Sequence, residues 1–261
     1  WSTRDFPAAL AWAKELSDPA EKKAAFTAMS NMAGELPPAR RRALVAEVGE
    51  HTSNGFQILW GLDQKEALKG FSMLPPDEQS AAWGSLSSAI IYASPQEASR
   101  LPIPDEITAG EVVPGIAGAW AKTDAAKAAT WVRSLKEEGD SQKLAAQNLM
   151  AVWSRNEPEA AAAWTKSLPD GPAKDAALDQ LAVTAFKTGN RAEALQWSLS
   201  LTDPQRRQDS LHERYREWAE IDPAGAKAAV EALPFDAAGK EGVINNVKEA
   251  VLEQEEDGSG Q

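Results

Sequence analysis

The chain of 261 residues contains no cysteine and only two histidines. The absence of cysteine excludes disulfides, thiol nucleophiles and thiolate metal sites. No apolar run approaches the ~18 residues that a membrane-spanning helix needs, and no signal peptide is visible. We therefore expect no direct membrane insertion of this stretch of sequence.

Basic residues are also fewer than acidic ones: the chain has 27 Lys and Arg and 39 Asp and Glu, which gives a net charge of −12. A nucleic-acid partner needs clustered basic residues, so this balance argues against nucleic acid. It also disfavours docking on anionic lipid. The excess of acid either keeps an elongated surface soluble or attracts a basic partner.

Sequence motifs that carry catalysis are absent. His51 and His212 lie far apart, and His212-Glu213 begins like a zinc-protease helix but has Arg216 where the second histidine would stand. There is no phosphate-binding loop, nucleophile elbow or calcium loop. Neighbouring carboxylates such as Glu137-Glu138 are typical of solvated faces. We expect no catalytic, cofactor-binding or metal-binding residues, and hence no enzyme.

A repeat dominates the sequence that is present. Trp120 is followed by Trp131 eleven residues on and by Leu135 at fifteen, and Trp153, Phe186 and Trp218 begin further copies at spacings of 33, 33 and 32 residues. These copies continue with Trp164 and Leu168, with Trp197 and Leu201, and with Ala229 and Leu233. Alanine-rich segments favour helix. The period therefore predicts pairs of helices.

Residues that commonly begin helices, such as Asp and Asp-Pro, predict the helix boundaries. First helices are predicted at about 6–16, 63–73, 124–135, 157–168, 190–201 and 222–233, many of them after an Asp or an Asp-Pro pair. Residues 94–118 depart most from the pattern, and Pro114 is expected to kink or break any helix there. Arg40, Arg41 and Arg42 form either a solvated face or an anchor for an acidic group.

Short helix pairs cannot bury an indole face alone, so neighbouring pairs must stack. Nine of the ten tryptophans stand at the repeat's packing positions, which favours a role in the core over a role as a ligand platform. Trp83 lies outside these positions. We therefore expect Trp164→Ala to cost about 3–5 kcal/mol and Trp83→Ala visibly less.

The unit Trp-Ala-x-x-Asp-Pro-x-x-Ala-x-x-Trp-x-x-x-Leu-Pro, with Pro158 six positions before Trp164, resembles the tetratricopeptide-like superfamily. It is similar to arrays in uncharacterised, exported bacterial proteins. The usual Leu-Gly pair after the first Trp is missing. The resemblance implies an all-α, right-handed superhelical solenoid of about eight antiparallel helix pairs, with one domain over 1–252 and a disordered acidic tail over 253–261.

The resemblance also implies a function without catalysis. We expect a scaffold that binds a protein or peptide on its curved surface. The alternative is a carbohydrate-binding or carbohydrate-active α/α toroid with exposed Trp beside an acid/base pair of carboxylates. Because the chain begins at Trp1 within a repeat, we expect a fragment or a processed form, and we favour a periplasmic or exported bacterial origin with any leader or anchor removed.

Overall fold

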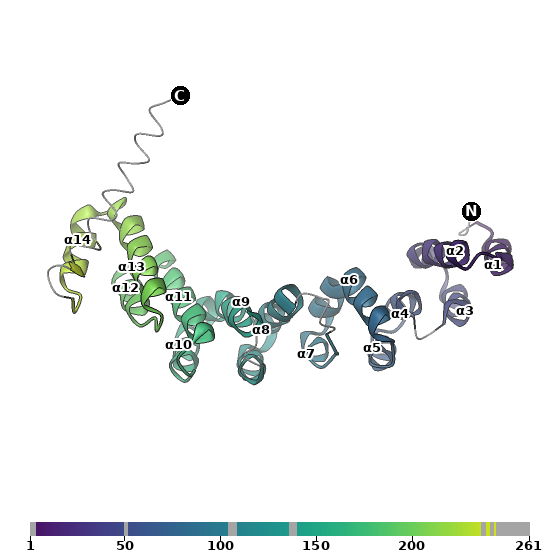
Figure 1. Cartoon of the computed structure of the whole chain (residues 1–261), viewed down its shortest axis with the longest axis horizontal. Coiled ribbons are helices and arrows are strands. Elements are labelled where there is room, and N and C mark those ends of the chain that lie inside the picture. The colour runs from purple at the N-terminus through teal and green to yellow at the C-terminus, as the bar shows by residue number, and fades with distance from the viewer. Residues whose placement is uncertain are drawn as a thin grey trace, which may run out of the picture. The chain divides into compact units, whose positions relative to one another are not determined.

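The computed structural model describes residues 4–49, 52–103, 109–135, 140–235, 239–240 and 243. Within these ranges the chain is entirely helical, with fourteen α-helices, one short 3-10 helix and no strand (Figure 1). The chain divides into two compact units, residues 1–112 and 113–261, and each is described separately. The prediction of an all-α fold is confirmed.

Unit 1 contains seven α-helices that lie wholly within it. They are α1 (Phe6–Glu15), α2 (Pro19–Asn31), α3 (Pro38–Val48), α4 (Ser53–Trp60), α5 (Gln64–Phe71), α6 (Pro76–Ala93) and α7 (Pro95–Ala98), with the 3-10 helix Ala33–Glu35 after α2. A first core cluster joins α1 to α4 through Phe6, Phe26, Leu44 and Ile58. A second set of rings joins α4, α5 and α6, where Phe71 packs edge-on against both Phe56 and Trp83.

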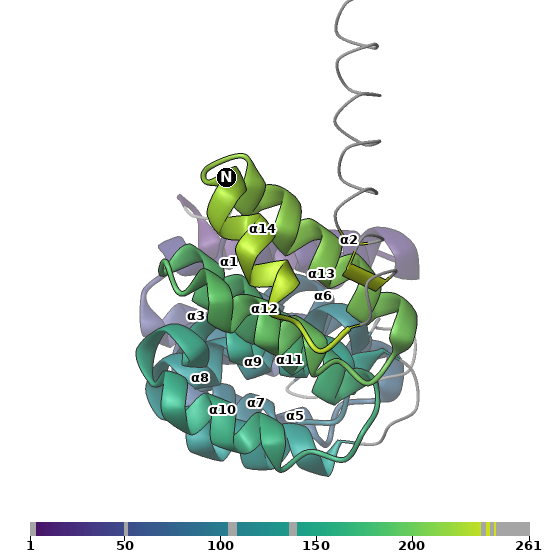
Figure 2. The same ribbon diagram turned by 90° about the vertical axis from the view of Figure 1, so that its left-hand side faces the viewer.

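Unit 2 contains the clean copies of the repeat. Its helices are α8 (Ala109–Ser134, of which 109–112 fall in unit 1), α9 (Ser141–Asn156), α10 (Pro158–Lys166), α11 (Pro172–Lys187), α12 (Arg191–Leu199), α13 (Pro204–Ala219) and α14 (Pro223–Glu231). From α9 onward, each helix packs against the next one in the chain (Figures 1 and 2). Long helices (α9, α11 and α13) alternate with short ones (α10, α12 and α14).

Aspartates set several helix starts, as the sequence predicts. The side chains of Asp18, Asp63, Asp203 and Asp222 each accept a hydrogen bond from a backbone N–H in the first turn of the helix that follows. These bonds satisfy donors that have no partner inside the helix. The predicted first helices agree with α1, α5, α10, α12 and α14 to within a few residues.

The sequence predicts a kink or a break at Pro114, and the structure shows no break there. Helix α8 continues through Pro114, and its only non-helical residue is Asp124, whose side chain accepts a bond from the Lys127 N–H. Pro114 lies in the second turn, where it cannot donate to the carbonyl of Gly110 and its ring crowds that carbonyl. Asp124 caps a new helix, so the predicted start of a first helix at 124 is confirmed.

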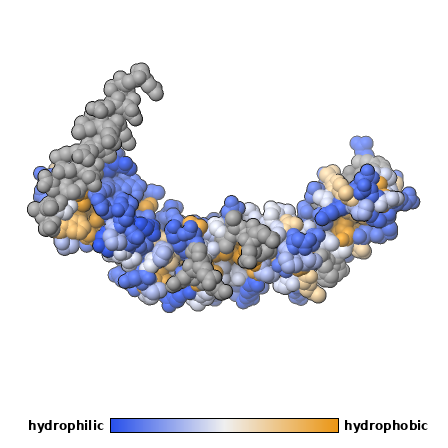
Figure 3. Space-filling view, in the orientation of Figure 1, coloured by the Kyte–Doolittle hydropathy of each residue, from blue (hydrophilic) through white to orange (hydrophobic). Residues whose placement is uncertain are grey.

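Of the eight repeated indoles among the described residues, four are buried, three are half-buried and one is exposed. Trp60, Trp120, Trp153 and Trp164 are buried, and the indoles of the pairs Trp120–Trp131 and Trp153–Trp164 lie 6.1 and 6.0 Å apart between ring centroids. Leu168, Leu201 and Leu233 at the following repeat position are buried as well. Described surface residues are largely hydrophilic in the view of Figure 3, with apolar residues in separate small patches.

Two tryptophans behave differently from the sequence prediction. Trp12 stands at a packing position but is 50% exposed. Trp83 is only 1% exposed, less than Trp164 at 8%. Its ring packs on Phe71 and its Nε1–H donates to the carbonyl of Pro102 at 2.9 Å. Burial therefore gives no reason for Trp83→Ala to cost less than Trp164→Ala, and the relative cost stays to be measured.

A recurring hydrogen bond closes the turns between helices. The carbonyls of Leu36, Leu74, Leu135 and Leu201 each accept a side-chain N–H from the next long helix; the donors are Arg41, Gln79, Gln142 and Arg207. Arg41 also donates to the carbonyls of Gly34 and Gly61. It therefore binds backbone carbonyls, whereas the sequence suggested a solvated face or an acidic partner.

Other predictions fall outside what the structure tests. The solenoid arrangement, the number of helix pairs and the single domain over 1–252 stay predictions. The tail 253–261 and His51 lie outside the described residues. None of the described helices is both long and apolar enough to cross a membrane.

Candidate functional site

A groove of about 720 Å³ lies between the short helices α10 and α12 of unit 2. Its floor comes from the end of α9 and the C-terminal half of α11. We call it the α10/α12 groove. Its lining residues are Ser154, Arg155, Pro158, Glu159, Ala162, Ala163, Lys166, Leu181, Thr184, Ala185, Thr188, Asn190, Glu193 and Trp197.

The small side chains of α10 leave this space open. Ala162 and Ala163 turn toward the groove, and Ala163 is exposed. In contrast, Trp164 of the same helix turns the other way and packs on Trp153. Helix α10 therefore buries its bulky residue on one side and presents methyl groups on the other.

A departure from the repeat accompanies the groove. The third copy begins with Phe186 where the two preceding copies begin with Trp120 and Trp153, and within the described residues no ring contact joins Phe186 to Trp197. The guanidinium carbons of Arg191 and Arg214 instead lie 5.8 and 5.7 Å from the Phe186 ring centroid. Both distances are typical of cation–π contacts. The Trp197 indole, without its usual ring partner, lines the groove half-buried.

Buried charge holds Phe186 in this position. Arg214 is only 4% exposed, and its guanidinium pairs with Glu213 at 2.6 Å and with Glu217 at 3.1 Å. Among the described residues, neither its Nε nor the buried Nε of Arg191 has a hydrogen-bond partner. A buried guanidinium needs compensation, which here comes from the two carboxylates and the face of the ring. The cluster therefore ties α11, α12 and α13 together at one point.

Polar contacts surround the exposed part of Trp197. Its Nε1–H donates to Glu193 at 3.2 Å, and the Lys166 ammonium lies 5.4 Å from the ring centroid. Glu159 and Arg155 line the groove as exposed side chains, and neither forms an ion pair with any described residue. The groove thus offers an aromatic face together with charges of both signs.

The groove floor contains a buried hydroxyl pair. Ser154 Oγ donates to the Met150 carbonyl at 2.6 Å and lies 2.7 Å from Thr184 Oγ1, which places the Thr184 hydroxyl as the donor between them. Leu181 and Ala185 make the remainder of the floor apolar. This combination of apolar floor and few fixed polar atoms is typical of a binding site.

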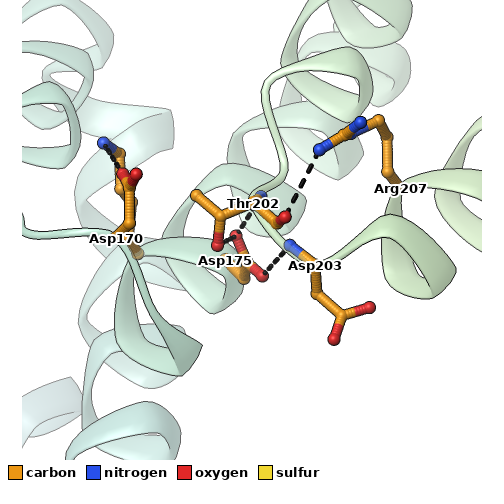
Figure 4. Close-up of polar contacts among 6 residues, drawn as sticks. Asp170, Asp175, Thr202, Asp203 and Arg207 are labelled. Atoms are coloured by element: carbon orange, nitrogen blue, oxygen red, sulfur yellow. Dashed lines mark hydrogen bonds and ion pairs between the residues drawn. The ribbon is translucent and has the colours of Figure 1, made fainter.

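A second cavity, of about 380 Å³, lies at the turn before α13 and contains the buried carboxylate of Asp175. Asp175 is 2% exposed and accepts three hydrogen bonds, from the backbone N–H and the hydroxyl of Thr202 and from the backbone N–H of Asp203 (Figure 4). Arg207 donates to the Thr202 carbonyl from the other side. All three donors to Asp175 lie in the turn before α13, so this carboxylate holds the conformation of that turn.

His212 is the one histidine among the described residues. It lies half-buried beside Leu211 and Phe235 in a cavity of about 300 Å³. Burial lowers the pKa of His212 below its usual value of 6.5, and the negative charge of Asp209 opposes that shift in part. In the described residues no group of three His, Asp or Glu side chains is arranged to hold a metal ion.

The sequence predicted no site residues, and the groove residues were missed. One feature of the sequence could have indicated the groove: the third copy begins with Phe186, whereas the other copies in unit 2 begin with Trp. In comparisons with known proteins, no family model, no curated protein and no solved structure matches the chain. The resemblance to tetratricopeptide-like repeats therefore stays a prediction.

Proposed function

We propose that this chain is a non-enzymatic interaction scaffold, a tetratricopeptide-like solenoid that binds a peptide or a segment of a partner protein in the α10/α12 groove. The observation that supports this most directly is the groove itself. It opens where the Trp–Trp packing of the repeat is replaced by the Phe186 cluster, and it presents Trp197 to a ligand.

The composition of the groove suits a peptide. About 720 Å³ lies within the range of ligand-binding sites, and the apolar floor, the hydroxyl pair and the unpaired Glu159 and Arg155 provide contacts for both main-chain and side-chain groups. The alternation of short and long helices in unit 2 supports the solenoid part of the proposal.

The carbohydrate alternative is less well supported. Lys166 lies over the ring of Trp197, and a neutral sugar that took its place would remove the cation from the ring without replacing its charge. The indole N–H is also engaged, since it donates to Glu193. We therefore treat oligosaccharide binding as an outcome that the experiment must distinguish.

The test is a selection of peptides from a random display library on the full chain, followed by calorimetry with two variants. Ala163→Trp places an indole in the groove. Thr130→Trp places the same indole at the equivalent exposed position 33 residues earlier, where no groove residue is affected. We expect selected peptides to bind the wild type and Thr130→Trp equally and to lose binding to Ala163→Trp.

Two results would overturn the proposal. Peptides that bind all three proteins with equal affinity would place the binding surface elsewhere. Failure to select any peptide, together with saturable binding of oligosaccharides that Trp197→Leu abolishes, would favour the carbohydrate alternative. Circular dichroism of both Trp variants confirms that the helical content is unchanged.

A further inference from the structure

We propose that the α10/α12 groove recognises a basic segment, and that an arginine of that segment takes the place of Lys166 on the face of Trp197 and pairs with Glu193. This inference rests on the proposed function, because it names the chemistry of the ligand at the same site. It follows from three features of the groove: a ring that already carries a cation, carboxylates that form no ion pair with any described residue, and an exposed lysine that occupies the ring.

The ring of Trp197 attracts a cation in the structure itself. Lys166 Nζ lies 5.4 Å from the ring centroid, within the ~6 Å of a cation–π contact. Lys166 is exposed, and its ammonium pairs with no carboxylate in the described part of the chain. It is therefore held at this position only by the ring, so a competing cation can displace it at small cost.

Arginine suits this position better than lysine. Its planar guanidinium stacks on an aromatic face and donates in a fork that fits a carboxylate, whereas an ammonium is a strongly hydrated point charge. Glu193 accepts from the Trp197 indole through Oε1 and pairs with no described cation. A guanidinium over the ring can therefore reach the carboxylate that already orients the indole.

Charge complementarity favours the same ligand. Glu159 and Glu193 balance Arg155 and Lys166 among the groove residues, so an arginine that takes the place of Lys166 on the ring keeps a positive charge beside these carboxylates. The nine residues of α10 place Glu159 and Lys166 about 10 Å apart along the helix axis. The chain as a whole carries a net charge of −12, which steers basic segments toward it.

The test uses the full chain and blocked peptides Ala-Ala-X-Ala-Ala in which X is Arg, Lys, Gln or Glu. The readout is the nitrogen–hydrogen resonance of the Trp197 indole, assigned from its loss in Trp197→Phe, at about 0.15 M salt to screen distant charges. We expect the Arg peptide to shift this resonance saturably and to bind more tightly than the Lys peptide. The Gln and Glu peptides should produce no shift.

Three variants distinguish displacement of Lys166 by the Arg peptide from a general attraction between the acidic chain and any basic peptide. Lys166→Ala should tighten binding of the Arg peptide by about two- to fivefold, because it removes the competing cation. Glu193→Gln keeps the acceptor for the indole but should weaken binding about fivefold through loss of the charge. Glu220→Gln, which removes one exposed carboxylate outside the groove, serves as the matched control and should change nothing.

The outcomes distinguish this inference from the proposed function. A shift caused by the Glu peptide, with weaker binding in Lys166→Ala, would overturn the basic ligand and leave the groove as a binding site. The same conclusion follows if the Arg peptide has no effect while library-selected peptides still lose binding to Ala163→Trp. If Ala163→Trp also has no effect on any peptide, both proposals fail.

Discussion

The carboxylate of Asp175 gives the sharpest test of how one helix pair is joined to the next. It accepts bonds of 2.6 and 2.8 Å from the N–H and hydroxyl of Thr202 and of 3.0 Å from the N–H of Asp203. In Asp175→Ala these three donors lose their acceptor at a partly buried turn. Each such donor costs about 1–3 kcal/mol, and water reaches some of them, so we expect a loss of about 3–5 kcal/mol in the free energy of unfolding.

The measurement is urea unfolding followed by circular dichroism and tryptophan fluorescence, with the midpoint and slope fitted separately. Asp175→Asn keeps one oxygen but sets its amide hydrogens against a backbone N–H, and should lose about 2 kcal/mol. Asp170→Ala is the matched control, since Asp170 forms only an exposed ion pair with Lys174 and should lose less than about 1 kcal/mol. Equal, small losses in Asp175→Ala and Asp170→Ala would refute the reasoning.

Three further perturbations follow from the packing and the charges. Trp83→Ala should cost about 3–5 kcal/mol in urea unfolding, at least as much as Trp164→Ala, because its buried indole donates to a carbonyl while the Trp164 Nε1 has no partner. Gln79→Leu should cost about 1 kcal/mol by removing the donor to the Leu74 carbonyl; no change would show that water replaces it. The pKa of His212 is lowered in the folded chain, so the unfolded chain binds more protons. Stability should therefore fall as the pH drops below about 6.5, and His212→Gln should reduce that slope.

The helices of this fold were predictable because their signals are local. A capping aspartate lies within three residues of the N–H that it accepts, as at Asp203 and Asp222. The repeat leucines Leu168, Leu201 and Leu233 are buried two residues beyond the last residue of α10, α12 and α14, so each stands at a fixed place in the turn that ends its helix. Such features depend on residues close together in the chain.

The errors arise where a residue's surroundings come from another helix. Trp83 lies outside the repeat pattern, and its burial depends on Phe71 and on the carbonyl of Pro102, nineteen residues away. Asp175 meets its donors 27 and 28 residues along the chain. Nothing in the local sequence separates this buried carboxylate from the exposed Asp170 five residues before it.

The groove illustrates the same limit. Its lining residues are ordinary alanines and charged residues of two helix faces, which sequence reasoning assigns to the solvated surface. What marks the site is the ring at position 186, because the guanidiniums of Arg191 and Arg214 contact it and no ring contact joins it to Trp197 in the described residues. Only the packing of α11, α12 and α13 shows that Phe186 contacts two arginines and not a tryptophan.

The absence of cysteine makes a direct test of ligand binding in the α10/α12 groove possible. A single cysteine introduced as Ala163→Cys lies in the groove, and one introduced as Thr130→Cys lies at the equivalent position outside it. The measurement is the rate of thiol alkylation with and without a saturating selected peptide. We predict that the peptide protects the cysteine at position 163 and leaves the rate at position 130 unchanged. Unchanged alkylation at position 163 under saturating peptide would contradict the account.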